Sequence, residues 1–287
     1  MFEFYTNKFK DFTVSSDKTV NEIILEEHLT GNVIFPLERV LLNDIAILLE
    51  KAILNKLSSD IQFQKNYWTW GFVTVYYSNF YLAQILNRLS NKFYIYVDDS
   101  LNKEVIYNND IYEFGQNNGD NTHQREFKLL KANYSKIKTY GNTRLQPIFD
   151  IYQTTEKDKI FKYTIDNEIK ESEIRNRINY QLKHYKEINL EHKNLDRYKR
   201  WYDDIIISNK VNSHYPDYFQ LLIINEKRFL FLAMLLNEIK AINPAFKIKI
   251  ERLSEKINEK YDSTFHDVNL NTRVLIGELL KWNMKTL

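Results

Sequence analysis

The chain has 287 residues with a formal net charge of +2, and 44% of them are hydrophobic and 15% aromatic. This composition excludes a disordered chain, and the nearly balanced charge means that any nucleic-acid site must be a local basic patch. Because cysteine is absent, a disulfide framework, a cysteine nucleophile and a thiolate zinc site are also excluded.

The first half of the chain is predicted to be mainly helical. Only six glycines and four prolines occur, which favours long helices over turns. Residues 1–32 are predicted to form an N-terminal arm, and apolar residues at helical spacing then predict a helix over 36–58. A second helix over 66–89 is apolar on most faces, so we expect it to be central and buried. Trp68 and Trp70 open this helix and are expected in the core.

The remaining elements add one small β region and several further helices. Two β-rich runs, at 93–97 and 105–107, predict a hairpin, and a polar loop is expected at 115–122. Further helices are predicted over 123–138, 144–153, 165–200, 216–242, 246–261 and 270–285. The expected fold is therefore mainly α with a small β-hairpin insertion, in which a helical domain over 33–200 is followed by a helical C-terminal extension over 201–287.

No segment of the sequence has the pattern of a membrane anchor or a secretion signal. The N-terminus lacks a basic stretch followed by an apolar run. The longest apolar stretch, residues 221–236, is interrupted by Glu226, Lys227 and Arg228. We therefore expect a soluble, cytoplasmic protein that does not bind membranes.

The most informative motif is Arg175-Asn176-Arg177-Ile178-Asn179-Tyr180, followed by His184. On one continuous helix, Arg177 and His184 would lie on nearly the same face, about 10 Å apart along the axis. A guanidinium can bind phosphate oxygens through paired N–H bonds, and an imidazole can move protons near neutral pH. This pair can supply metal-independent RNA cleavage. The same spacing also suits a solvated helix face or an ion pair with Glu173.

The order of motifs resembles the HEPN superfamily, the helical domains of many prokaryotic toxins and phage-defence proteins. The resemblance covers residues 33–190: one helix carries Tyr76-Tyr77-Ser78-Asn79-Phe80, the next opens with His123, and a later one carries the Arg175–Tyr180 motif. It implies a four-helix bundle that forms a homodimer. It also implies a site in which four to six residues separate an arginine from a histidine, as six residues separate Arg177 from His184. Tyr180 instead of histidine after Arg175 is similar to branches with an Arg-x-x-Ala-Asp-Tyr-like helix.

A basic segment lies between His123 and Arg144. It contains six basic residues against one acid, Glu126, with two tyrosines between them. Such a segment can hold a phosphate backbone while bases rest on aromatic rings. We therefore assign RNA positioning to Arg125, Lys128 and Lys131 together with Arg175, Asn176 and Tyr180. A solubilising lysine face would have the same composition.

A different chemistry is suggested by Tyr96-Val97-Asp98-Asp99 on the predicted hairpin. This turn resembles the metal-binding turn of reverse transcriptases, in which two carboxylates hold Mg²⁺. A polymerase site needs a further aspartate on a separate strand, and the upstream candidate, Asp44, lies in a helical pattern. The histidines show no metal-ligand spacing, so no metal or cofactor is expected.

These patterns lead to three hypotheses. The first is a metal-independent endoribonuclease of toxin or phage-defence type, with Arg177 stabilising the phosphorane and His184 moving protons. It would act as a homodimer on RNA, with an antitoxin or defence-system protein as a possible partner. The second is a non-catalytic HEPN-fold module that binds RNA or a partner protein. The third is a Mg²⁺-dependent enzyme that uses the Tyr-Val-Asp-Asp turn.

Overall fold

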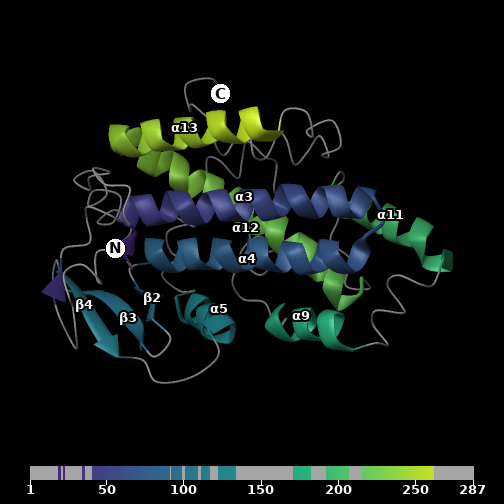
Figure 1. Cartoon of the computed structure of the whole chain (residues 1–287), viewed down its shortest axis with the longest axis horizontal. Coiled ribbons are helices and arrows are strands. Elements are labelled where there is room, and N and C mark those ends of the chain that lie inside the picture. Colours follow the sequence, from purple (N-terminus) through teal and green to yellow (C-terminus); the bar gives the residue numbers. More distant parts are fainter. Residues whose placement is uncertain are drawn as a thin grey trace, which may run out of the picture.

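The structure is a computed structural model that describes residues 19–20, 22, 34–35, 41–90, 92–98, 101–108, 111–116, 122–133, 171–181, 192–206 and 215–261. Seven helices account for most of these residues, so the prediction of a mainly helical chain is confirmed. Figure 1 shows the arrangement, with α4 (Trp68–Leu89) between α3 (Leu41–Gln64) on one side and α5 (Thr122–Ala132) and α9 (Glu171–Tyr180) on the other.

Helices α3 and α4 form an antiparallel pair joined by a tight turn. Asn66 adopts a φ of 63° there, a left-handed conformation that asparagine tolerates better than most residues. Near the turn the helices approach so closely that a Cβ atom on Gly71 would clash with the ring of Phe63. The sequence prediction for α4 is confirmed: it is buried along most of its length and packs against four other helices and the sheet.

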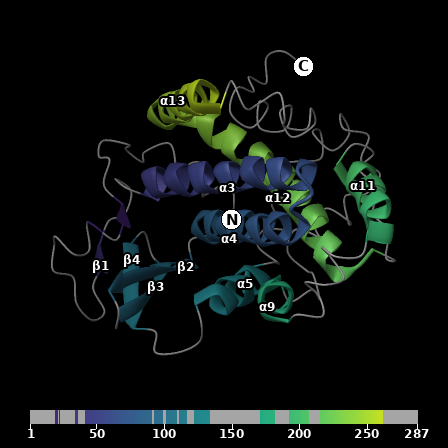
Figure 2. The same ribbon diagram turned by 45° about the vertical axis from the view of Figure 1, so that its right-hand side comes forward.

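The C-terminal helices complete the core around this pair. Helix α12 (Asp217–Ile242) crosses α4, α11 (His192–Ile206) packs against α12, and α13 (Pro244–Tyr261) packs against α3 and α12. Figure 2 shows this crossing from a second direction. Helix α13 begins where the side chain of Asn243 accepts a hydrogen bond from the backbone N–H of Phe246 at 2.8 Å, with Pro244 in the first helical position.

A four-stranded antiparallel sheet lies at one end of the bundle (Figure 1), with strand order β1-β4-β3-β2. The predicted hairpin is β2 (Lys92–Asp98) with β3 (Leu101–Asn108), to which β4 (Ile111–Gln116) and the short β1 (Ile34–Phe35) are added. The polar loop predicted over 115–122 begins later than expected, because Gly115 and Gln116 pair with β3. Phe93, Ile95 and Val105 turn toward the main apolar core.

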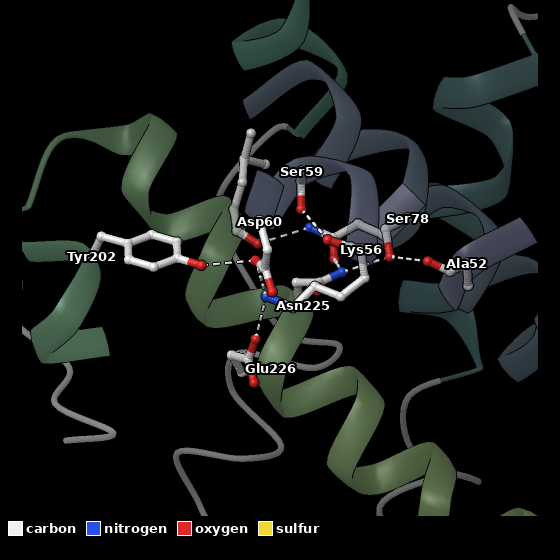
Figure 3. Close-up of polar contacts among 10 residues, drawn as sticks. Ala52, Lys56, Ser59, Asp60, Ser78, Tyr202, Asn225 and Glu226 are labelled. Atoms are coloured by element: carbon white, nitrogen blue, oxygen red, sulfur yellow. Dashed lines mark hydrogen bonds and ion pairs between the residues drawn. The ribbon is translucent and has the colours of Figure 1, made fainter. Parts of the chain in front are cut away.

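A buried polar network, defined here as Lys56, Asp60, Ser78, Tyr202, Asn225 and Glu226, connects α3, α4, α11 and α12 (Figure 3). Lys56 Nζ lies 3.0 Å from Asp60 Oδ1 and 2.8 Å from Glu226 Oε1, and the side chains of Lys56 and Asp60 are fully buried. The hydroxyl of Tyr202 donates to Asp60 at 2.8 Å. Asn225 donates to Ser78, which donates to the carbonyl of Ala52. These bonds hold the C-terminal helices in one register against α3 and α4.

Two predictions fail in detail. Trp68 is buried as expected, but Trp70 is 61% exposed because it occupies the outer face of the first turn of α4. The helix predicted over 165–200 is not continuous, since α9 ends at Tyr180 and Gln181 is not helical. Helix α11 runs across position 200, where the sequence division into a bundle and an extension was placed. The helices predicted over 144–153 and 270–285 and most of the arm predicted over 1–32 lie outside the described residues.

Candidate functional site

Helix α9, which carries the arginine motif, is fixed to the bundle by an apolar stripe and a buried ion pair. Ile174 and Ile178 are buried in the aromatic cluster around Trp68 and Phe72. Glu171 accepts two hydrogen bonds from the guanidinium of Arg228, at 3.0 and 2.7 Å, and both side chains are almost fully buried. The two-point geometry of this pair fixes the first turn of α9 against α12.

This docking places three polar side chains from distant parts of the chain side by side. Tyr76 of α4 and His123 of α5 share a hydrogen bond, with 2.9 Å between the phenol oxygen and Nδ1. The guanidinium of Arg175 on α9 lies over the ring of Tyr76, 5.2 Å from its centroid. We call these three residues the Tyr76–His123–Arg175 cluster. Tyr76 is buried, whereas His123 and Arg175 are only partly covered.

Aromatic rings surround the imidazole of this cluster. The ring centroid of Phe80 lies 4.3 Å from that of His123, and those of Tyr76 and Tyr77 lie 5.7 and 5.9 Å away. Phe127, one turn after His123 on α5, packs on the rings of Tyr76 and Phe80. The imidazole therefore sits in a largely apolar wall, which favours its neutral form.

The protonation states follow from this environment. Burial, and then the positive charge of Arg175, lower the pKa of His123 below its usual value of about 6.5. Burial raises the pKa of the Tyr76 phenol, and Arg175 offsets only part of that rise. At neutral pH the cluster thus contains a neutral imidazole, a neutral phenol and one guanidinium. In the tautomer whose Nδ1–H donates to Tyr76, the Nε2 atom of His123 carries the lone pair of a general base.

The outer face of α9 carries the other residues of the motif. Arg177 pairs with Asp217 at the start of α12, with 2.8 Å between Nη2 and Oδ2, and both side chains are well exposed. Asn176 is exposed, and Tyr180 is 75% exposed. Because exposed ion pairs contribute only about 0–1 kcal/mol, a phosphate can compete with Asp217 for Arg177.

The structure describes only one residue of the predicted catalytic pair. Arg177 is described, but His184 lies outside the described residues. Arg177 and His184 would share one face only on a continuous helix. That expectation is wrong, because the last helical residue of α9 is Tyr180. The catalytic role of His184 stays a prediction.

The basic segment on α5 divides into buried and exposed residues. Lys128 and Lys131 are exposed, as an RNA-positioning role requires. Arg125 is only 4% exposed, and its guanidinium lies over the ring of Tyr94 at 4.5 Å from the centroid. In this conformation Arg125 packs between α5 and the sheet and does not reach a surface phosphate. The basic residues after Asn133 lie outside the described residues.

The turn considered for Mg²⁺ binding is only partly within the described residues. Asp98 ends β2 opposite Leu101, and Asp99 lies outside the described residues. Asp44 is buried on α3, where its Oδ2 lies 2.6 Å from Nε of Arg88. Within the described ranges no group of three or more histidine, aspartate or glutamate side chains could hold a metal ion.

Sequence reasoning did not identify the partners that complete the site. Tyr76 and His123 were quoted for the resemblance but were not assigned a role, and Glu171, Asp217 and Arg228 were not singled out. Helical spacing shows which residues share a face of one helix. It does not show that positions 76, 123 and 175 meet.

A comparison with protein-family models, with curated proteins and with solved structures found no match for this chain. None of the helices that the structure describes has an apolar stretch long enough to cross a bilayer.

Proposed function

We propose that this chain is a HEPN-like protein that cleaves RNA without a metal ion. The observation that carries the proposal is the Tyr76–His123–Arg175 cluster, in which a phenol and an imidazole share a 2.9 Å hydrogen bond beside a guanidinium. These are the group types that metal-free phosphodiester cleavage requires: a proton acceptor, a proton donor and a positive charge for the phosphorane.

Each residue of the site has a role in RNA cleavage that follows from its position. His123 takes the proton from the 2′-hydroxyl, and the imidazolium that forms gives this proton to the leaving 5′-oxygen. The Tyr76 hydroxyl holds the imidazole in one orientation. Arg175, which is partly exposed, binds the phosphate that reacts, and Arg177 binds an adjacent phosphate once Asp217 is displaced. Asn176, Tyr180, Lys128 and Lys131 remain the exposed candidates for positioning the strand. A partner copy, as the family resemblance implies, would extend this surface.

A specific observation favours a second candidate function. Arg177 is paired with Asp217, and α9 ends before His184, so the motif described by the structure holds no imidazole on its outer face. A site of this kind fits the non-catalytic module, which binds RNA or a partner protein through the arginines and the exposed Tyr180.

Incubation of the purified chain with fluorescently labelled single-stranded RNA in EDTA distinguishes the RNA-cleaving enzyme from the non-catalytic module. Cleavage is expected for the enzyme, and binding without cleavage for the module. Loss of a histidine base typically costs a factor of 10² to 10⁴, so we expect at least a hundredfold slower cleavage for His123→Ala, and a comparable loss for Arg175→Ala. Activity that appears only with Mg²⁺ would instead support the Tyr-Val-Asp-Asp turn.

Two further variants place the catalytic groups. Arg177→Ala and His184→Ala test the pair inferred from the sequence, and Arg200→Ala, an exposed arginine on α11 bonded to its own helix, is the matched control. If cleavage survives His123→Ala but not His184→Ala, the proton-transfer role belongs to His184. Unchanged cleavage in all four variants would end the ribonuclease proposal.

A further inference from the structure

A groove on the opposite side of the bundle lies between α3 and α13, with a cavity of about 380 Å³. Within the part of the chain that the structure describes, its lining comes from two helices: Ala46, Ile47 and Glu50 on α3, and Ala245, Ile248, Lys249, Arg252, Leu253 and Lys256 on α13. The volume falls in the range of small-molecule sites. Figure 1 shows α13 and α3 on the side of α4 away from α5 and α9, so the groove is separate from the Tyr76–His123–Arg175 cluster.

The lining is apolar at its base and positively charged at its rim. Ala46 and Leu253 are buried beneath it, and Ile248 is 49% exposed, the only large aliphatic residue of the described chain with such exposure. Among the described lining residues, the rim has three basic side chains and one acidic one, an excess of two positive charges. Oε1 of Glu50 lies 2.6 Å from Nζ of Lys256. The groove therefore combines an aliphatic surface with a rim of net positive charge, which complements an anion.

The type of apolar side chain in the groove further restricts the chemical class of the ligand. Nucleobases bind preferentially on aromatic rings, and none of the described lining residues is aromatic, although aromatic residues make up 15% of the chain. An aliphatic chain gains free energy simply by covering Ile47, Ile248 and Leu253, at about 25 cal/mol per Å² of apolar surface removed from water.

We infer that this groove binds an aliphatic carboxylate of fatty-acid type. The hydrocarbon chain lies along Ile248 and Leu253 between the two helices, and the carboxylate is held by Arg252 and Lys249 at the rim. The pair of Lys256 with Glu50 closes one end of the site by linking α13 to α3. The inference does not depend on the ribonuclease proposal, since the two sites share no residue.

Titration calorimetry with sodium decanoate below its micelle concentration tests this site. We expect decanoate to bind, 1-decanol to bind at least tenfold more weakly because it lacks the charge, and butyrate and adenosine monophosphate not to bind. In the double variant Lys249→Glu/Arg252→Glu, decanoate affinity should fall at least tenfold while decanol affinity is unchanged. The exposed Lys199→Glu on α11 is the charge-reversal control and should keep wild-type affinity.

The melting temperature distinguishes binding in the groove from non-specific detergent binding. Decanoate should raise the melting temperature of the wild type and of Lys199→Glu but not of the double variant, whose altered residues lie at the rim, outside the buried core, so the fold is retained. The inference is wrong if decanoate does not bind, if it binds the double variant equally well, or if adenosine monophosphate binds as tightly.

Discussion

The buried polar network around Lys56 and the Tyr76–His123–Arg175 cluster both contain a basic side chain and a tyrosine, but they differ in how the basic side chain is buried and paired. In the network, Lys56 and Asp60 are fully buried and the lysine touches two carboxylates. Burial alone would lower the pKa of Lys56, but the charges of Asp60 and Glu226 raise it above the usual value. In the cluster, His123 and Arg175 are only partly covered, and the contacts described for them include aromatic rings.

The difference indicates that the residues that stabilise this fold are not those proposed to bind and cleave RNA. A charge that is buried and paired is held in one place, and removing its partner is costly, so the network fixes the register of four helices. A guanidinium held beside rings keeps donors available for an incoming anion. We therefore expect substitutions in the network to lower the free energy of unfolding strongly, and substitutions in the cluster to change it little.

The largest effect is expected from Lys56→Met. This change leaves the buried carboxylate of Asp60 and the partly buried carboxylate of Glu226 without their cation, which should lower the free energy of unfolding by about 3–5 kcal/mol. Urea denaturation followed by circular dichroism measures the loss. Lys51→Met, an exposed lysine on the same helix, should stay within about 0.5 kcal/mol of the wild type. A loss below about 1 kcal/mol for Lys56→Met would show that the network does not stabilise the fold.

The next largest effect is expected from Glu171→Gln. The guanidinium of Arg228 would lose the charge of its buried partner, and the free energy of unfolding should fall by about 2–3 kcal/mol. Because this pair docks α9, RNA binding should weaken as well. Glu173→Gln, on the exposed face two residues later, is the control for both measurements. Weakened RNA binding in Glu173→Gln alone would contradict the role given to the Glu171 pair.

A smaller loss is expected from Tyr202→Phe. The phenol donates to Asp60 at 2.8 Å, and burial together with the charge of Asp60 raises its pKa, so it stays a donor at all ordinary pH values. Removing one buried hydrogen bond should cost about 1 kcal/mol. Thermal and urea unfolding measure it against Tyr180→Phe, whose side chain is 75% exposed and which should show no change.

The smallest stability effect is expected in the cluster, from the pH dependence of His123. Its pKa is lower in the folded state than the usual value near 6.5, so the unfolded chain binds this proton first. The contribution to stability is therefore present above pH 6.5 and decreases as the pH falls toward the folded pKa. His123→Gln should flatten this part of the curve of unfolding free energy against pH. A curve that keeps the wild-type slope would place the titrating group elsewhere.

The main helices could be predicted because they are long and strongly patterned. The periodicity of the segment that forms α4 also indicates its central position, and α12 begins within one residue of the predicted start. The interruption at Gln181 could not be predicted in this way, since no glycine or proline marks it. The exposure of Trp70 could not be predicted in this way, because the less buried face of α4, on which Thr74 and Tyr77 are only partly buried, also carries apolar residues.

The contacts of the site could be predicted only in part. Ile174 and Ile178 are four positions apart, a spacing that predicts one apolar face of a helix, and both are buried. The pairs of Arg228 with Glu171 and of Arg177 with Asp217 join positions 57 and 40 residues apart. Such pairs depend on how helices cross, which the spacing of residues within one helix does not contain.

The tight turn between α3 and α4 has a consequence for synthesis of the chain. These two helices can pair as soon as they leave the ribosome, but α12, which covers their apolar side, begins about 130 residues after α4 ends. At elongation rates of 5–20 residues per second, the uncovered pair would wait roughly 6–26 s for it. A nascent chain stalled in that interval should bind chaperones that recognise exposed aliphatic surface, and should release them once residue 242 has emerged.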